Sequence, residues 1–216
     1  SPFLRKQVKE RIDACLKRSG WGPFPRPKAT QQMLILREGR SETVAVPGGA
    51  VHLGSTPAER DVARALCEAR LGRSAARRCS TLRFPFENQQ RRVRVHAFRL
   101  QRTEVSRRAY QACVQAKACR QVPARFRAPG KGSLPMVGVT WAEARSYCRW
   151  RGGDLPTERQ WVAAARGDTM PPRLWPWGRH AVRGCARILA PKVASIGPVG
   201  GQPCDASAFG VLGLAG

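Results

Sequence analysis

The sequence lacks long apolar runs, and no stretch approaches the roughly 20 residues that a membrane-spanning helix needs. Its first residues, SPFLRK, also lack the apolar core of a secretion signal. We therefore expect that any export signal or membrane anchor was removed or lies outside these 216 residues. With 42% apolar residues and six tryptophans, the chain is not disordered and can bury a core of its own.

Acidic residues are scarce, since 14 aspartates and glutamates accompany 39 lysines and arginines, for a formal net charge of +25. Such a charge attracts nucleic acid, anionic lipid or acidic protein. The basic residues are mostly arginines scattered along the whole chain, which is also typical of a GC-rich coding bias, and no nucleic-acid-binding module is visible. A basic domain that binds nucleic acid or another anionic partner therefore stays an alternative function.

Histidines are few, and no cysteine pair has the spacing of a zinc site, so we expect no metal cluster. The eight cysteines are even in number and irregularly spaced, which favours disulfides over free buried thiols. Disulfides indicate an oxidising compartment, so we expect an extracytoplasmic (periplasmic or secreted) protein. The pairs that would close short local loops are Cys67–Cys79, Cys113–Cys119 and Cys185–Cys204.

Hydrophobic periodicity predicts an α+β fold with few short strands and two to four helices in its main domain. A basic helix at 3–18 and a Pro-rich linker at 20–30 would form an N-terminal segment, residues 1–30, ahead of a domain at 31–216. Within that domain we expect strands at 33–39, 43–55 and 93–100, helices at 57–72, 107–119, 141–152 and 158–167, a loop at 72–90, and little regular structure beyond residue 167.

Three polar residues are suited to begin the later helices. Ser106, Thr140 and Thr157 are N-cap candidates, and Glu143 would complete a capping box with Thr140. The predicted helix that contains Cys113 must end near Lys117 if Cys113 is to pair with Cys119, because residues six apart do not lie side by side on a helix.

Five segments occur in an order that resembles a known family. They are PGGAVHLGS at 47–55, VRVHAFRLQRTEVSRRAYQACV at 93–114, LPMVGVTWAEARSYCRWRGGDLPTERQWVAAARGD at 134–168, WPWG at 175–178 and PVGGQPCDASAFGVLGLAG at 198–216. Together they resemble the formylglycine-generating enzyme or sulfatase-modifying-factor family, whose fold is irregular, loop-rich and C-type-lectin-like. The residues that carry the fold motif, which we expect to act as core and caps, are Glu104, Trp141, Tyr147, Trp150, Pro156, Thr157, Glu158, Trp161, Trp177 and Gly178.

The resemblance implies that the catalytic blocks would follow Gly216, because the family places its copper-binding cysteine pair there. It therefore implies no catalytic residue and no cofactor in this chain, with copper or calcium bound only if a C-terminal part supplies ligands. Asp154 stands where the family usually has arginine, and Gly213 where it usually has aspartate. Residues 183–189, RGCARIL, also lack the asparagine that helps such relatives to bind calcium.

These observations favour a non-catalytic binding, sensing or assembly module of a larger protein or complex over an enzyme. The partner would be a protein or a second chain that completes the domain, and Trp175, Trp177 and His180 are candidates for a binding surface on the loop-rich end. The alternative is a fragment of a copper-dependent oxidase that acts on substrate cysteines. A related iron enzyme is disfavoured, since no His-x3-His spacing occurs.

Overall fold

The computed structural model describes residues 43–71, 90–123, 132–167, 173–179, 185 and 196–215. The predicted N-terminal helix, the linker, the strand at 33–39 and nearly all of the loop at 72–90 lie outside these ranges. The described strands are β1 (Thr43–Val46), β2 (Gly49–Leu53), β3 (Arg91–Val95) and β4 (Phe98–Gln101). The described helices are α2 (Pro57–Leu71), α4 (Arg107–Gln115), α5 (Trp141–Trp150) and α6 (Glu158–Arg166), followed by the short 3-10 helix η4 (Pro203–Asp205). The α+β class and the loop-rich character predicted from the sequence are confirmed.

The four strands form one bent antiparallel ribbon, which we call the ribbon (residues 43–53 and 91–101). β1 pairs with β4 and β2 pairs with β3, and both pairings keep one register, with Val46 opposite Phe98 and Gly49 opposite Val95. The sequence predicted one continuous strand at 43–55 and another at 93–100. In the structure the first is divided into β1 and β2, and the second into β3 and β4. A Cβ on Gly48 would lie 2.9 Å from the Ala97 nitrogen, so the two chains come too close at the break for a side chain there.

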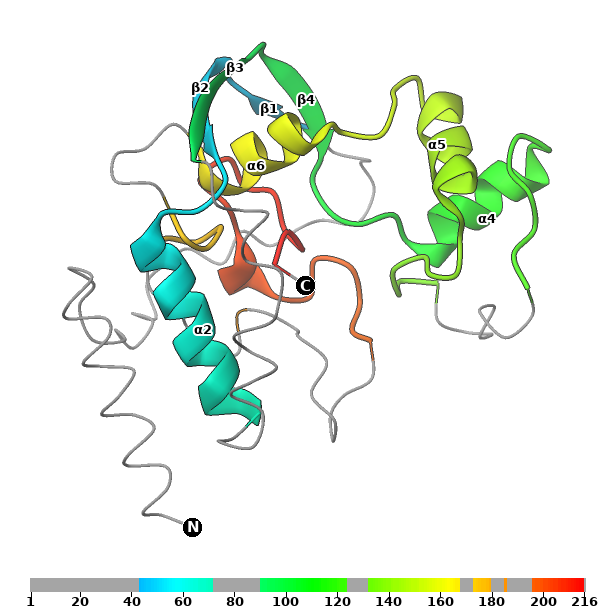
Figure 1. The fold of residues 1–216 in the computed structure, drawn as a ribbon. Coiled ribbons are helices and arrows are strands. Elements are labelled where there is room, and N and C mark those ends of the chain that lie inside the picture. Colours follow the sequence, from blue (N-terminus) through cyan, green and yellow to red (C-terminus); the bar gives the residue numbers. More distant parts are fainter. Residues whose placement is uncertain are drawn as a thin grey trace.

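The break turns the ribbon over so that both halves bury a face. Side chains two residues apart share a face of a strand, yet the buried residues Val46 and Val51 are five apart. The chain therefore reverses its faces at 47–48, and the partner strand does the same between Val95 and Phe98. This lets one ribbon wrap around α6, which Figure 1 shows beneath it.

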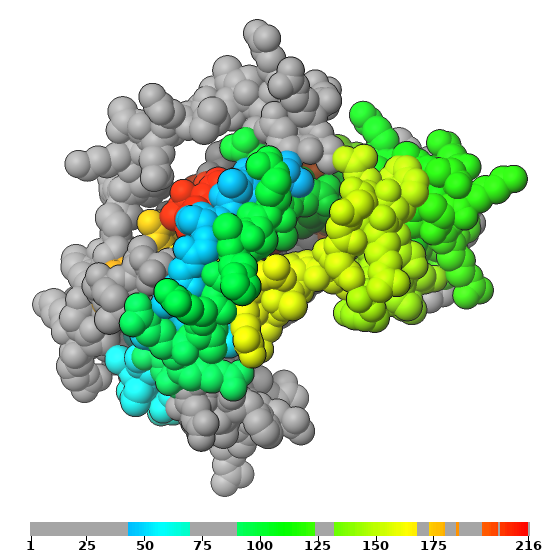
Figure 2. Space-filling model, turned by 90° about the horizontal axis from the view of Figure 1, so that it is seen from above, coloured from blue at the N-terminus to red at the C-terminus, as the bar shows by residue number. Residues whose placement is uncertain are grey.

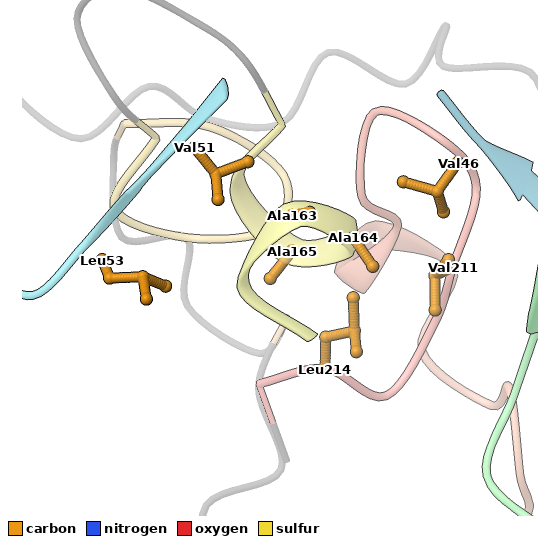
Figure 3. Packing of buried hydrophobic residues seen from close by; sticks show 8 residues of the cluster. All are labelled: Val46, Val51, Leu53, Ala163, Ala164, Ala165, Val211 and Leu214. Atoms are coloured by element: carbon orange, nitrogen blue, oxygen red, sulfur yellow. The ribbon is translucent and has the colours of Figure 1, made fainter. Parts of the chain in front are cut away.

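Helix α6 is the centre of the main core. Its alanines Ala163, Ala164 and Ala165 are all buried, and their small side chains allow the ribbon and the C-terminal segment to approach the helix from two sides (Figure 3). The residues that surround α6 in this core are Val46, Val51, Leu53, Val211 and Leu214. We call this cluster the ribbon–α6 core.

Helices α4 and α5 form a second unit to one side, the α4–α5 lobe (Figures 1 and 2). Tyr110 and Tyr147 stack inside it with ring centroids 5.9 Å apart, next to the buried Cys113. Helix α4 ends at Gln115, four residues before Cys119 and close to Lys117, where the predicted pairing of Cys113 with Cys119 required it to end. The chain turns back through Lys117, which has φ 58°, and this return is what places Cys119 beside Cys113.

Three helices begin with the capping residues that the sequence predicts. The hydroxyls of Ser106, Thr140 and Thr157 accept hydrogen bonds from backbone N–H groups at the third helical position. The capping box of Thr140 with Glu143 is confirmed, and Thr157 forms a second one with Gln160.

Helix α2 also begins with reciprocal hydrogen bonds, between Thr56 and Glu59. The buried Glu59 carboxylate in addition lies 3.5 Å from the Arg166 guanidinium at the end of α6. A helix near the N-terminal edge of the described chain is thereby fastened to the central helix. No described helix is long and apolar enough to cross a membrane.

Candidate binding surface

Three tryptophans on α5 and α6 reach the surface, although we expected them in the core. Trp141 is 66% exposed, Trp161 44% and Trp150 38%. Tyr147, on the same segment, is buried as predicted. The expectation of core packing was therefore wrong for these tryptophans in this chain. Each exposed tryptophan leaves a large apolar area in water, and tryptophan is a residue type that is enriched at protein interfaces.

Trp141 is held beneath an arginine. The Arg145 guanidinium carbon lies 5.1 Å from the centre of the Trp141 ring, in cation–π geometry. The same guanidinium donates from Nε and Nη2 to the two carboxylate oxygens of Asp154, each at 2.7 Å. Arg145 is thus held both by Asp154 and by the face of the Trp141 ring, while Trp141 itself remains exposed.

Asp154 explains one departure from the family pattern. Its carboxylate accepts the fork of Arg145 and the backbone N–H of Leu155, and these hydrogen bonds lower the pKa of Asp154 to about 2. Arg149 lies 3.8 Å away and adds to the effect. An aspartate at this position therefore belongs to an ion pair that ties the end of α5 to the segment leading into α6.

Gly213, the second position at which the sequence differs from the family pattern, lies against the carboxyl group of Glu104. Its φ is 74°, a left-handed conformation that favours glycine, and a Cβ there would overlap the carboxyl group of Glu104. The Gly213 N–H donates to Asp205 Oδ2 at 3.0 Å. The Glu104 side chain thus fills the space that a side chain at position 213 would need.

Asp205 is a buried carboxyl group next to this contact, and only 1% of its surface is exposed. Burial raises its pKa to about 6, and the Glu104 carboxylate adds to the rise, while hydrogen bonds from the N–H groups of Gly213 and Ala215 oppose it. Its Oδ1 has no hydrogen-bond partner in the described structure. The Asp205 carboxyl group therefore stays protonated to a higher pH than is usual for aspartate.

The predicted binding residues Trp175 and Trp177 form a stacked pair. Their ring centroids are 5.3 Å apart, and the planes differ by 8°. Backbone hydrogen bonds in both directions between Trp175 and Gly178 close the turn. Both side chains are partly buried, and the predicted third member, His180, lies outside the described residues. The turn is a rigid element that offers only part of each indole to a partner.

The cysteines that the structure describes are mostly bonded. Cys113 joins Cys119 and Cys185 joins Cys204, with Cα atoms 5.3 and 5.2 Å apart. Cys67 is also disulfide-bonded, and its predicted partner Cys79 lies outside the described residues. These bonds are compatible with an extracytoplasmic location.

Cys148 is the free cysteine among the described residues. Burial raises the pKa of its thiol, and nearby Asp154 raises it further, so the thiolate is disfavoured. Within the described ranges no three His, Cys, Asp or Glu side chains lie close enough to hold a metal ion. The described residues therefore do not fit a copper site built on two reactive thiolates.

Comparison with known proteins places these features in one family. A family model described as the sulfatase-modifying factor enzyme 1-like domain matches residues 31–216. The chain belongs to this family. The resemblance read from the five sequence segments is thereby confirmed.

Curated relatives with different printed activities match shorter segments. The inactive C-alpha-formylglycine-generating enzyme 2 of Bos taurus is 47% identical over 55 residues, 23% of this chain and 18% of that protein. The formylglycine-generating enzyme of Streptomyces coelicolor is 41% identical over 61 residues, 28% of this chain and 19% of that protein. The hercynine oxygenase of Mycolicibacterium smegmatis is 34% identical over 87 residues, 39% of this chain and 20% of that protein. The matched part of this chain thus spans about a fifth of each relative's length.

The remaining motif residues serve the fold locally. Thr157 and Glu158 begin α6, Pro156 precedes that cap, and Gly178 closes the tryptophan turn. Reasoning from the sequence missed Asp205 and Arg145. Asp205 lies in a loop without periodicity, and Arg145 is one of many arginines, so neither gave a local signal of its role.

Proposed function

We propose that this chain is a non-catalytic binding or assembly module of the formylglycine-generating-enzyme-like family and that it contacts a protein partner. The exposure of Trp141, Trp150 and Trp161 carries the proposal, because solvent-exposed tryptophans on rigid helices are the residues that most often dominate protein–protein contacts. Arg145, stacked on Trp141 and fixed by Asp154, is pre-organised in the same way. Pre-organised side chains lose less conformational entropy when a partner binds.

The state of the cysteines supports a role without oxidase chemistry. Five of the six cysteines within the described ranges are in disulfides, and the pKa of the sixth, Cys148, is raised by burial. Nucleophilic and metal-binding cysteines instead have lowered pKa values and access to solvent. The disulfides also support our proposal that the protein works in a periplasmic or secreted location.

A cross-linking experiment tests the binding role. A photo-crosslinking amino acid at position 141 is expected to join the protein to one discrete protein in its native host. The matched control has the same photo-crosslinking amino acid in place of Arg120, an exposed residue of the α4–α5 lobe that is not one of the three tryptophans. Equal, diffuse labelling from both positions would contradict the proposal.

An oxidation assay tests the alternative, a copper-dependent oxidase of substrate cysteines. The purified chain is incubated with copper(I), oxygen and a cysteine-containing peptide, and aldehyde is trapped with a hydrazide probe. We expect no aldehyde beyond that formed by copper and peptide alone. Turnover that depends on the protein, and that the Cys148→Ala variant reduces, would replace our proposal with the oxidase.

A further inference from the structure

The outer face of the ribbon is a basic surface that the proposed function does not use. Side chains alternate across a strand, so the residues next to those buried on α6 point outward. Arg94 pairs with Ala50 and Arg92 with His52 on the outer face of one half, and Arg99 pairs with Ala45 on the other. All three arginines are exposed. Figure 2 shows this side of the ribbon as open surface.

No acidic side chain offsets these charges within the ribbon. Its two segments, TVAVPGGAVHL and RRVRVHAFRLQ, contain four arginines and two histidines but no aspartate or glutamate. Among the described residues, no ion pair or hydrogen bond involves the side chain of Arg92 or Arg94. Arg99 donates to the Thr43 hydroxyl and carbonyl, both at 2.8 Å, which keeps its side chain along the sheet. The ribbon thus carries several like charges without an acidic partner among the described residues, an arrangement that an anionic surface would relieve.

We propose that this face docks on the surface of an anionic phospholipid membrane. Arginine guanidinium groups pair well with phosphate oxygens, and several basic side chains on one face act together near a negatively charged bilayer. The face is supported from behind, because the inward residues Val46, Val51 and Leu53 of the two halves pack in the ribbon–α6 core. Such a surface can lie along a membrane without inserting a helix.

The same features disfavour nucleic acid as the occupant. Proteins that bind single strands stack bases on aromatic side chains, and the ribbon's one aromatic residue, Phe98, packs against the core. The disulfides in addition point to compartments in which membranes, rather than nucleic acids, are the common anionic surface.

Vesicle sedimentation of the full chain tests the proposal. The probes are phosphatidylcholine vesicles with and without about a third phosphatidylglycerol, at low salt, where surface electrostatics are least screened. Since each arginine near an anionic leaflet contributes roughly a fivefold factor, Arg92→Gln/Arg94→Gln is expected to weaken binding to the anionic vesicles about 25-fold. The control Arg120→Gln/Arg159→Gln removes the same charge from exposed positions outside the ribbon and is expected to weaken it far less.

Several outcomes would overturn the membrane assignment. Equal losses in the two double variants would show that net charge, not the ribbon, drives binding. Equal binding to vesicles without phosphatidylglycerol would exclude an anionic site. Tighter binding of a single- or double-stranded oligonucleotide at the same salt, lost in Arg92→Gln/Arg94→Gln, would assign the face to nucleic acid. These variants alter no tryptophan of α5 or α6, so the outcomes do not depend on the proposed protein–protein contact. Thermal melts check that the two double variants are folded.

Discussion

The ribbon–α6 core and the α4–α5 lobe each bury a cluster of side chains, but the residue types in the two clusters differ. The first buries valine, leucine and alanine side chains from segments as far apart as residues 46 and 214. The second buries two stacked tyrosines and a disulfide, all between residues 110 and 147. The core around α6 therefore joins segments that are far apart in the chain, whereas the lobe is built within a shorter stretch of sequence and is closed by a covalent bond.

The two regions also differ in the burial and the pKa of a carboxyl group. Asp205, near the ribbon–α6 core, is buried and its pKa is raised to about 6. Asp154, at the edge of the lobe, is exposed and paired with Arg145, and its pKa is lowered to about 2. The two regions should therefore respond oppositely to pH, which gives a way to tell them apart in solution.

The largest expected effect is on the long-range core. Leu53→Ala removes a fully buried side chain from the ribbon and should lower the free energy of unfolding by about 2–5 kcal/mol. Urea unfolding measures this loss, and hydrogen exchange should show weaker protection in α6 than in α4. Ile196→Ala, at a residue that is 41% exposed, is the control and should change stability by less than about 0.5 kcal/mol. A comparable loss in both variants would mean that Leu53 is not a core residue.

The second effect is the pH response of Asp205. Its folded pKa of about 6 lies above the unfolded value of about 4, so the folded state holds an extra proton between these values. Stability should therefore fall as pH rises from 4 to 6, by no more than about 3 kcal/mol, and Asp205→Asn should abolish this fall. Thermal melts from pH 3 to 8 measure it.

Asp154 is a control for that experiment, because its contribution to stability should depend on pH in the opposite direction. Because its folded pKa is lowered, its contribution is present above pH 4 and is lost as the pH falls toward 2. Asp154→Asn should flatten the acid limb and leave the slope between pH 4 and 6 unchanged. A change in that slope would show that Asp205 is not its source.

The third effect concerns the disulfide of the lobe. Replacing Cys113 and Cys119 with alanine opens a loop with a sequence separation of 6, which should cost about 2 kcal/mol through the entropy of the unfolded chain. Hydrogen exchange should increase in α4 and remain unchanged in α6 if the two regions are energetically separate. Cys148→Ala, which breaks no disulfide, is the matched control. Increased exchange throughout the ribbon would show that the lobe supports the main core.

The smallest effect compares the caps of the two regions. Thr140→Ala and Thr157→Ala each remove one capping box, at the start of α5 and of α6, and each should cost about 1 kcal/mol. Serine at either position should restore most of the loss, because its hydroxyl can accept the same hydrogen bond. Denaturant unfolding checks both values. A much larger loss at Thr157 would show that α6 needs its cap more than its packing.

The helices and caps were predictable because their signals are local. Periodicity located α2, α4, α5 and α6, and a threonine followed by glutamate at the third helical position marked the capping box of Thr140 with Glu143. Thr157 was predicted as an N-cap, and its capping box with Gln160 was found only in the structure. The extent of α4 was less predictable, since the residues from Ala116 to Cys119 have no helix breaker. The return of the chain at Lys117 follows from the disulfide, which is a tertiary constraint.

The surface was harder to predict than the fold. Trp141 and Trp161 match a motif that we expected in the core, and the sequence contains nothing that distinguishes a packed indole from an exposed one. The site residues Arg145 and Asp154 are nine positions apart and meet only because α5 ends between them. Pairings of this kind depend on where a helix stops, not on any spacing visible in the chain.

The sequence by itself determined the family, the α+β class and the starts of three helices, because each rests on motifs or on contacts within a few residues. The tertiary structure alone decided that the ribbon turns over at Pro47–Gly48, that Asp205 is buried beside Glu104, and that the three tryptophans face solvent. These features depend on segments far apart in the chain being brought together. Burial, charge and exposure belong to the assembled surface, and no local pattern of residues specifies them.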